Sequence, residues 1–109
     1  MTGDYRVGYA PEALTDLRNT YVYIARVLKA PETARRFTER IRREIRSLDT
    51  LPARFPAVDW APWDSMGVRR FNVDNFAVFY QVDATKLTVT VIRILYGGRD
   101  FQRIAEIGE

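Results

Sequence analysis

The chain has 109 residues, 47% of them hydrophobic, and its 17 basic and 14 acidic side chains give a net charge of +3. It contains no cysteine and no histidine, which excludes disulfides, thiolate metal sites, a cysteine nucleophile and the commonest general acid–base residue. We therefore expect a single basic domain over residues 1–109, cytoplasmic, with no membrane segment, no metal and no cofactor. Any catalysis would depend on carboxylate, tyrosine, lysine or arginine side chains.

The first half of the chain predicts a strand followed by two helices. Residues 5–9 alternate with the period of a strand. Pro11 and Pro31 each begin a helix, because proline is tolerated in the first helical turn. The apolar stripe predicted for the first helix is Leu14, Leu17, Tyr21, Ile24 and Leu28. The buried side predicted for the second helix is Ala34, Phe37, Ile41, Ile45 and Leu48. The short connection between them predicts an antiparallel helical hairpin.

The opposite side of the second helix is rich in arginine. Its basic residues are Arg35, Arg36, Arg40, Arg42, Arg43 and Arg46. Only Glu39 and Glu44 oppose them, and the helical spacing predicts the ion pairs Glu39–Arg43 and Arg40–Glu44. A solvated helix face is the favoured interpretation, and a basic binding stripe is the alternative.

Residues 50–67 form a long connection that contains three prolines and the aromatic residues Phe55, Trp60 and Trp63. A connection of this length is unusual in a compact domain and needs a structural or functional reason. We favour aromatic side chains that anchor the segment to the core, and the alternative is a surface that contacts a target.

The second half predicts three strands. Residues 68–73 and 76–82 flank Asp74-Asn75, a two-residue hairpin signal, and residues 87–95 are rich in β-branched side chains. Gly97-Gly98 ends the last strand, and residues 100–107 predict a short tail or helix anchored by Phe101 and Ile104. The order β-α-α-β-β-β predicts an α+β fold, an antiparallel sheet with the helical hairpin on one face and the other face free.

Four segments, taken in this order, carry a resemblance to a known family: residues 12–17, 45–48 before Leu51-Pro52, 69–82 and 91–100. With this order of elements, the chain resembles the RelE/ParE superfamily, the toxins of type II toxin–antitoxin modules. It implies a growth inhibitor from a plasmid-stabilisation system and, as partner, a cognate antitoxin whose flexible segment wraps the toxin.

RelE-like members of the superfamily cleave mRNA on the ribosome, which needs proton transfer and cations near the phosphate. The resemblance places one family lysine at Arg70, but a second falls on Val68 and the central arginine falls on Ala77. Tyr96 and Arg99 remain near the C-terminus, with Tyr96 where many relatives carry histidine. If the chain is a ribonuclease, its catalytic residues are Arg70, Tyr96 and Arg99, and this set is incomplete.

ParE-like members inhibit DNA gyrase by binding, and the residues favour this interpretation. The candidate residues for binding target or antitoxin are Arg69, Arg70, Arg93, Arg99 and Arg103. Neighbouring residues of a strand point to opposite faces, so we expect Arg70 on the free face, and Arg93, flanked by Val91 and Leu95, on the solvent side. Two alternatives stay open: a ribosome-dependent mRNA endonuclease, and a degenerate member that binds its antitoxin without toxicity.

Overall fold

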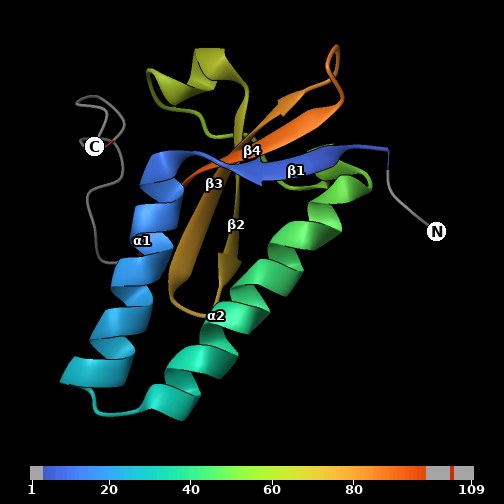
Figure 1. Ribbon diagram of the computed structural model, residues 1–109. Coiled ribbons are helices and arrows are strands. Elements are labelled where there is room, and N and C mark those ends of the chain that lie inside the picture. The colour runs from blue at the N-terminus through green and yellow to red at the C-terminus, as the bar shows by residue number, and fades with distance from the viewer. Residues whose placement is uncertain (1–3, 98–103, 105–109) are drawn as a thin grey trace.

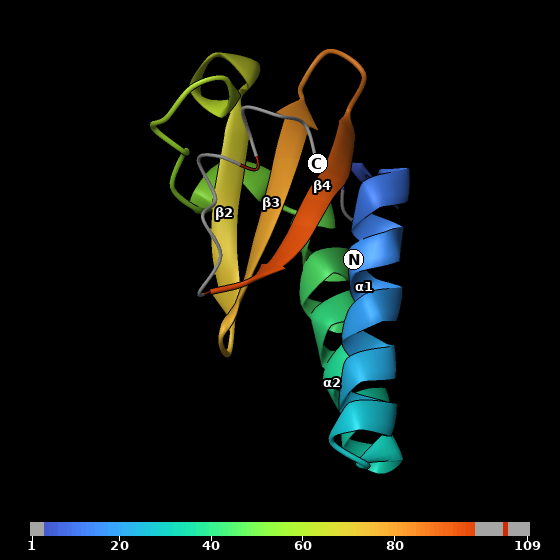
Figure 2. The same cartoon turned by 90° about the vertical axis from the view of Figure 1, so that its left-hand side faces the viewer.

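The computed structural model of the chain describes residues 4–97 and residue 104. Its elements follow the predicted order and form two layers, a four-stranded sheet and a helical hairpin on one face of it (Figures 1 and 2). The bounds are β1 (Arg6–Tyr9), α1 (Pro11–Val22), α2 (Pro31–Arg46), β2 (Val68–Val73), β3 (Phe76–Asp83) and β4 (Thr88–Tyr96). The predicted α+β class and order are confirmed. No helix within residues 4–97 is long and apolar enough to cross a membrane.

The strands lie in the order β1-β4-β3-β2. β2, β3 and β4 are antiparallel neighbours, as predicted, but β1 pairs with β4 in parallel, with Val7 opposite Val89. The sheet is therefore mixed and not wholly antiparallel. The reason is that β1 is joined to the antiparallel strands β2, β3 and β4 through the two helices. A connection of this length allows two strands to run parallel, which a tight hairpin forbids.

The main core lies between the sheet and the helices. The predicted buried side of the second helix is confirmed, since Ala34, Ile41 and Ile45 of α2 and Leu48 of the 3-10 turn that follows it are all fully buried. Phe37 is partly buried and packs on Phe76, with ring centroids 5.2 Å apart. Each fully buried isoleucine or leucine side chain stabilises the fold by roughly 1.5–3 kcal/mol.

The buried side of α1 differs from the predicted stripe. Leu17 is buried as predicted, and Ala13 and Thr20 are buried with it, whereas Leu14 and Leu28 remain 41% and 55% exposed. After α1 the chain continues as a π-helix, η1 (Tyr23–Val27), which shifts the phase of the side chains relative to a regular helix. As a result, several large apolar side chains near the tip of the hairpin face outward.

The second face of the sheet is not free, so that expectation was wrong. It carries a smaller apolar cluster formed by Val58, Trp63, Val68, Ala77, Phe79, Leu95 and Ile104. The connection between α2 and β2 folds beside the sheet, and the ring of Trp63 lies 4.7 Å from that of Phe79. Its aromatic residues therefore anchor it, as favoured. The reason is that β3 has apolar side chains on both faces of the sheet, so both faces must be shielded from water. Ile104 is buried as predicted, and Phe101 lies outside the described residues.

The last strand, β4, ends at Tyr96 and is followed by a turn at Gly97, where the sequence predicted its end. The N–H of Gly97 donates to the carbonyl of Asn75 at 2.7 Å, which joins the end of β4 to the β2–β3 turn. A Cβ at this position would lie 2.9 Å from that carbonyl oxygen, so the close approach requires glycine.

Candidate functional site

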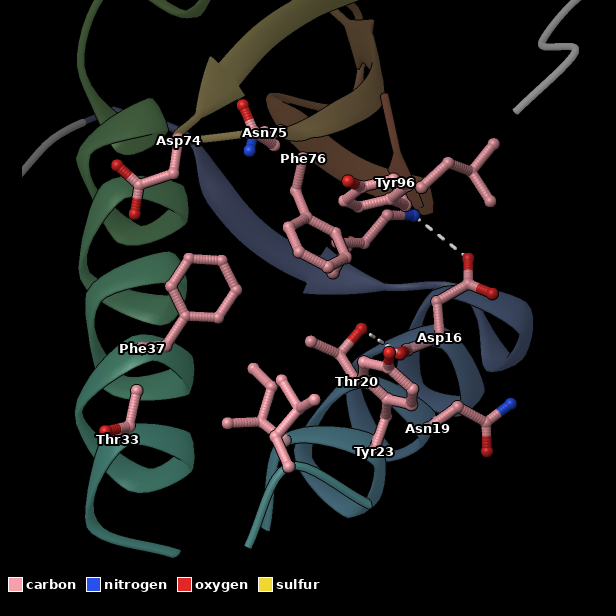
Figure 3. A pocket seen from close by; sticks show the side chains of 14 residues that line it. Asp16, Asn19, Thr20, Tyr23, Thr33, Phe37, Asp74, Asn75, Phe76 and Tyr96 are labelled. Carbon is pink, nitrogen blue, oxygen red and sulfur yellow. Dashed lines mark hydrogen bonds between the residues drawn. The ribbon is translucent and has the colours of Figure 1, made fainter. Parts of the chain in front are cut away.

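A groove opens between the tip of the helical hairpin and the β2–β3 turn, with a volume of about 710 Å³ (Figure 3). Three aromatic rings lie in series along it: Phe37 from α2, Phe76 from β3 and Tyr96 from the end of β4. The ring centroids of Phe37 and Phe76 are 5.2 Å apart, and those of Phe76 and Tyr96 are 5.5 Å apart. The groove thus offers a mainly aromatic wall that brings together residues from both halves of the chain.

One part of the groove's rim is apolar and exposed. Tyr23, Leu28 and Tyr96 line it and are 53%, 55% and 54% exposed. The π-helix η1 helps to place Tyr23 and Leu28, since the N–H of Leu28 donates to the carbonyl of Tyr23 at 3.1 Å. Large apolar side chains gathered at a concave surface usually mark an interaction site.

Asp16 forms the polar base of the groove. Its carboxylate accepts hydrogen bonds from Arg93 Nε at 2.7 Å, Arg93 Nη2 at 3.0 Å and the Ile94 N–H at 2.9 Å. The side chains of Asp16 and Arg93 are only 12% and 13% exposed. This bidentate pair ties α1 to β4 at the point where both border the groove.

The position of Arg93 corrects the expectation that it faces solvent. Phe79 pairs with Arg93 while Tyr80 pairs with Val91, so Ile92 is an extra residue and β4 has a bulge. The bulge breaks the alternation of side chains, and Val91 and Leu95 lie in different apolar clusters. Arg93 is therefore a largely buried residue paired with Asp16, and its role in binding a target or antitoxin stays a prediction.

On the opposite side of the groove, Arg40 holds the β2–β3 turn. Its Nη1 contacts the two carboxylate oxygens of Asp74 at 2.9 and 3.0 Å. The predicted Arg40–Glu44 pair is therefore replaced by a pair between elements. The predicted Glu39–Arg43 pair is also absent within the described residues, because Glu39 pairs with Arg35 at 3.0 Å.

Arg69 and Arg70 point to opposite faces, as predicted. Arg69 is on the helix side, where its Nη1 donates to the carbonyl of Phe55 at 2.6 Å. Arg70 is on the face away from the helices, with its guanidinium 5.8 Å from the ring centre of Phe79. Its Nε donates to the Asn72 side chain at 3.2 Å. The expected orientation of Arg70 is confirmed, whereas its role stays a prediction.

The structure does not bring the candidate ribonuclease residues together. Arg70 lies opposite Phe79 and Tyr96 opposite Phe76, so the two are separated by about 10 Å along the strands and about 10 Å across them. They also lie on opposite faces, since Tyr96 contacts Phe76 on the helix side. Arg99 and Arg103 lie outside the described residues.

The two positions at which the resemblance places family cations, Val68 and Ala77, are buried. Val68 and Ala77 are 0% and 1% exposed, within the apolar cluster of the second face. A cation at either position would be desolvated without a partner in that cluster. Residues 4–97 and 104 also contain no group of three or more acidic side chains that could hold a metal ion.

Two tyrosines have a shifted pKa, and both shifts go upward. Burial raises the pKa of Tyr80, opposed by Arg69 and Arg54, and burial raises the pKa of Tyr9, opposed by Arg42 and Arg46. A phenol with a raised pKa is a weaker candidate for a general base at neutral pH.

Sequence reasoning found Tyr96 but missed the groove and the role of Asp16. The sequence did contain a signal for the groove, because the first helix has more large apolar residues than one buried face can hold. The aromatic pairs Phe37–Phe76 and Phe76–Tyr96 join residues far apart in the chain, so no local pattern reveals them.

A helical hairpin on a mixed sheet of order β1-β4-β3-β2, with a groove at the hairpin tip, is an α+β toxin fold of the RelE/ParE kind. Residues 7–101 match the family described as "ParE toxin of type II toxin-antitoxin system, parDE", and the chain belongs to this family. It is thus a toxin of a type II toxin–antitoxin module, which confirms the resemblance seen in the sequence.

Solved structures support the same fold. The chromosomal ParDE system from P. aeruginosa aligns with a TM-score of 0.71 at 20% identity, covering 85% of this chain and 96% of that one. The RelBE2 toxin–antitoxin complex from Mycobacterium tuberculosis aligns at 0.63 and 18% identity, covering 88% and 94%. A double mutant of free RelE from E. coli aligns at 0.63 and 16%, covering 99% and 97%. No curated protein matches the sequence.

Proposed function

We propose that the chain inhibits growth by binding DNA gyrase, without cutting RNA, and that a cognate antitoxin neutralises it. The observation that carries the proposal is the separation of Arg70 and Tyr96 onto opposite faces of the sheet. Phosphodiester cleavage needs the proton-transfer group and the cation within hydrogen-bond reach of the same reacting group.

The buried positions Val68 and Ala77 add to this argument. An RNA backbone docked on the second face would meet an apolar cluster there, where the family's nucleases carry cations. The loss of two cations weakens both the binding of the phosphate and the stabilisation of its transition-state charge. A binding inhibitor has no such requirement, so this arrangement is compatible with action on a protein target.

For the antitoxin, we infer that an amphipathic helix occupies the groove beside Phe37, Phe76 and Tyr96. The aromatic wall fits the apolar face of such a helix, and the exposed Tyr23 and Leu28 would be covered on binding. Several solved structures with this fold are toxin–antitoxin complexes, which supports a partner of this class.

Two assays on the purified chain separate the candidate functions. In a supercoiling assay with gyrase, we expect inhibition that an added antitoxin reverses. In a translation extract, we expect mRNA to remain intact when its 5′ ends are mapped by primer extension.

The opposite results would assign a different activity. Codon-phased mRNA cuts with active gyrase would establish the ribosome-dependent endonuclease, and the exposed Tyr96 is the observation that favours it. Normal growth of cells that contain folded, antitoxin-binding protein would identify a degenerate member without toxicity.

A further inference from the structure

The positive charge of the chain is concentrated on α2. This helix contains six arginines and three glutamates, a charge of +3 that equals the net charge of the whole chain. Two of the glutamates, Glu32 and Glu39, both pair with Arg35, and Arg40 pairs with Asp74. The acidic residues therefore neutralise one part of the helix and leave another part uncompensated.

The uncompensated part is the α2 arginine face, which consists of Arg36, Arg43 and Arg46. All three are exposed, and none forms a hydrogen bond or ion pair with a residue in the described part of the chain. From Arg36 to Arg46 the helix rises through ten residue steps, about 15 Å. The helix lies in the outer layer of the molecule (Figures 1 and 2), and the exposure of the three side chains leaves their guanidinium groups accessible to solvent.

The composition of this surface distinguishes between classes of partner. Every exposed residue of α2 from Arg35 to Arg46 is charged, and none is apolar or aromatic. A stable protein–protein interface needs an apolar core with aromatic anchors, which the groove has and this surface lacks. A single-stranded nucleic acid would need aromatic side chains for base stacking. A duplex backbone needs only exposed cations, and arginine suits phosphate best.

We propose that the α2 arginine face binds the phosphodiester backbone of double-stranded DNA, without sequence preference. The length of about 15 Å corresponds to roughly four to five base pairs along the duplex axis, so the three guanidinium groups can each meet a phosphate. This surface is separate from the groove, so the proposal does not depend on the gyrase or antitoxin assignments.

The test is fluorescence anisotropy of a short labelled duplex of mixed sequence, titrated with the full chain from about 50 to about 200 mM salt. We expect weak, salt-sensitive binding. The triple substitution R36Q, R43Q and R46Q should lower the affinity at least about tenfold and reduce the slope of log K against log salt by about 2.7. The matched control is R18Q, R26Q and K86Q, which removes three exposed charges from other elements.

The control should retain most of the affinity, and circular dichroism should show both variants folded. The proposal is overturned if the two variants lose affinity equally, or if the unsubstituted chain does not bind at low salt. Binding of a polyglutamate peptide in place of the duplex would assign the face to an acidic protein segment. A duplex RNA bound as tightly as DNA would widen the ligand to any duplex backbone, and binding only to RNA would overturn the assignment to DNA.

Discussion

Asp16 and Arg93 are 77 positions apart in the chain and form a largely buried bidentate ion pair, with contacts of 2.7 and 3.0 Å. The same carboxylate accepts the N–H of Ile94 at 2.9 Å, next to the bulge of β4. Because both side chains are largely buried, at 13% and 12% exposure, solvent screens the pair little. This pair therefore sets the position of α1 over the sheet, and with it the shape of the groove.

Substitution of Asp16 by Asn should destabilise the fold by about 3–5 kcal/mol, since it leaves the buried Arg93 charge without its counter-ion. The measurement is the free energy of unfolding from urea denaturation. The matched control is D74N, which breaks the exposed Arg40–Asp74 pair and should cost less than about 1 kcal/mol. Equal losses in the two variants would show that the buried pair does not hold α1 in place.

The groove makes a prediction for antitoxin binding. Leu28→Glu should weaken the toxin–antitoxin affinity at least about tenfold, because it places a charge in the apolar rim that the antitoxin helix would cover. Calorimetry with the purified partner measures this. Leu87→Glu is the control, since Leu87 is similarly exposed at 46% but lies in the β3–β4 turn, away from the groove. Unchanged affinity for the Leu28 variant would exclude the groove as the antitoxin site.

The hydroxyl of Tyr96 should be dispensable. In a binding inhibitor the Tyr96→Phe variant keeps its aromatic contact with Phe76, so we expect cell killing and gyrase inhibition within about twofold of the unsubstituted chain. In a nuclease the same change would remove the proton-transfer group and cost about 10²–10⁴-fold in rate. Colony counts after induction, together with the supercoiling assay, distinguish the two results.

Restoring the family cation at Ala77 should harm the protein and not add activity. Ala77→Arg buries an unpaired charge in the apolar cluster on the second face of the sheet and should destabilise the fold by about 3 kcal/mol or more. Asn72→Arg is the control, because Asn72 is exposed and lies on β2 directly opposite Ala77 of β3. Thermal melting of both variants provides the comparison. A stable Ala77→Arg protein with new ribonuclease activity would contradict the proposed function.

Alkaline pH should destabilise the fold through Tyr80. Burial raises its pKa in the folded state, so its contribution is fully present below the unfolded pKa near ~10 and is lost as pH rises from there through the folded pKa. Above pH ~10 the unfolded chain binds fewer protons, and the free energy of unfolding falls with pH. Urea denaturation between pH ~9 and ~11 should show a shallower decline of the free energy of unfolding for Tyr80→Phe than for the unsubstituted chain, and an equal decline would contradict the prediction.

Much of the fold follows from the sequence alone. The strand bounds of β2, the Asp74-Asn75 turn and the buried side of α2 were predicted correctly, because each depends on residues within a few positions of one another. The same locality explains why Arg69 and Arg70 could be assigned to opposite faces. The family could also be identified, since the order of elements is a property of the sequence.

Only the tertiary structure decided the rest. The bulge that turns Arg93 toward Asp16, the parallel pairing of β1 and the cover on the second face all join residues far apart in the chain. In each case the free energy comes from burial and pairing across elements, which outweighs local periodicity. For this reason the sequence alone identified Arg70 and Tyr96 as candidates, whereas their separation and the groove emerged only from the folded chain.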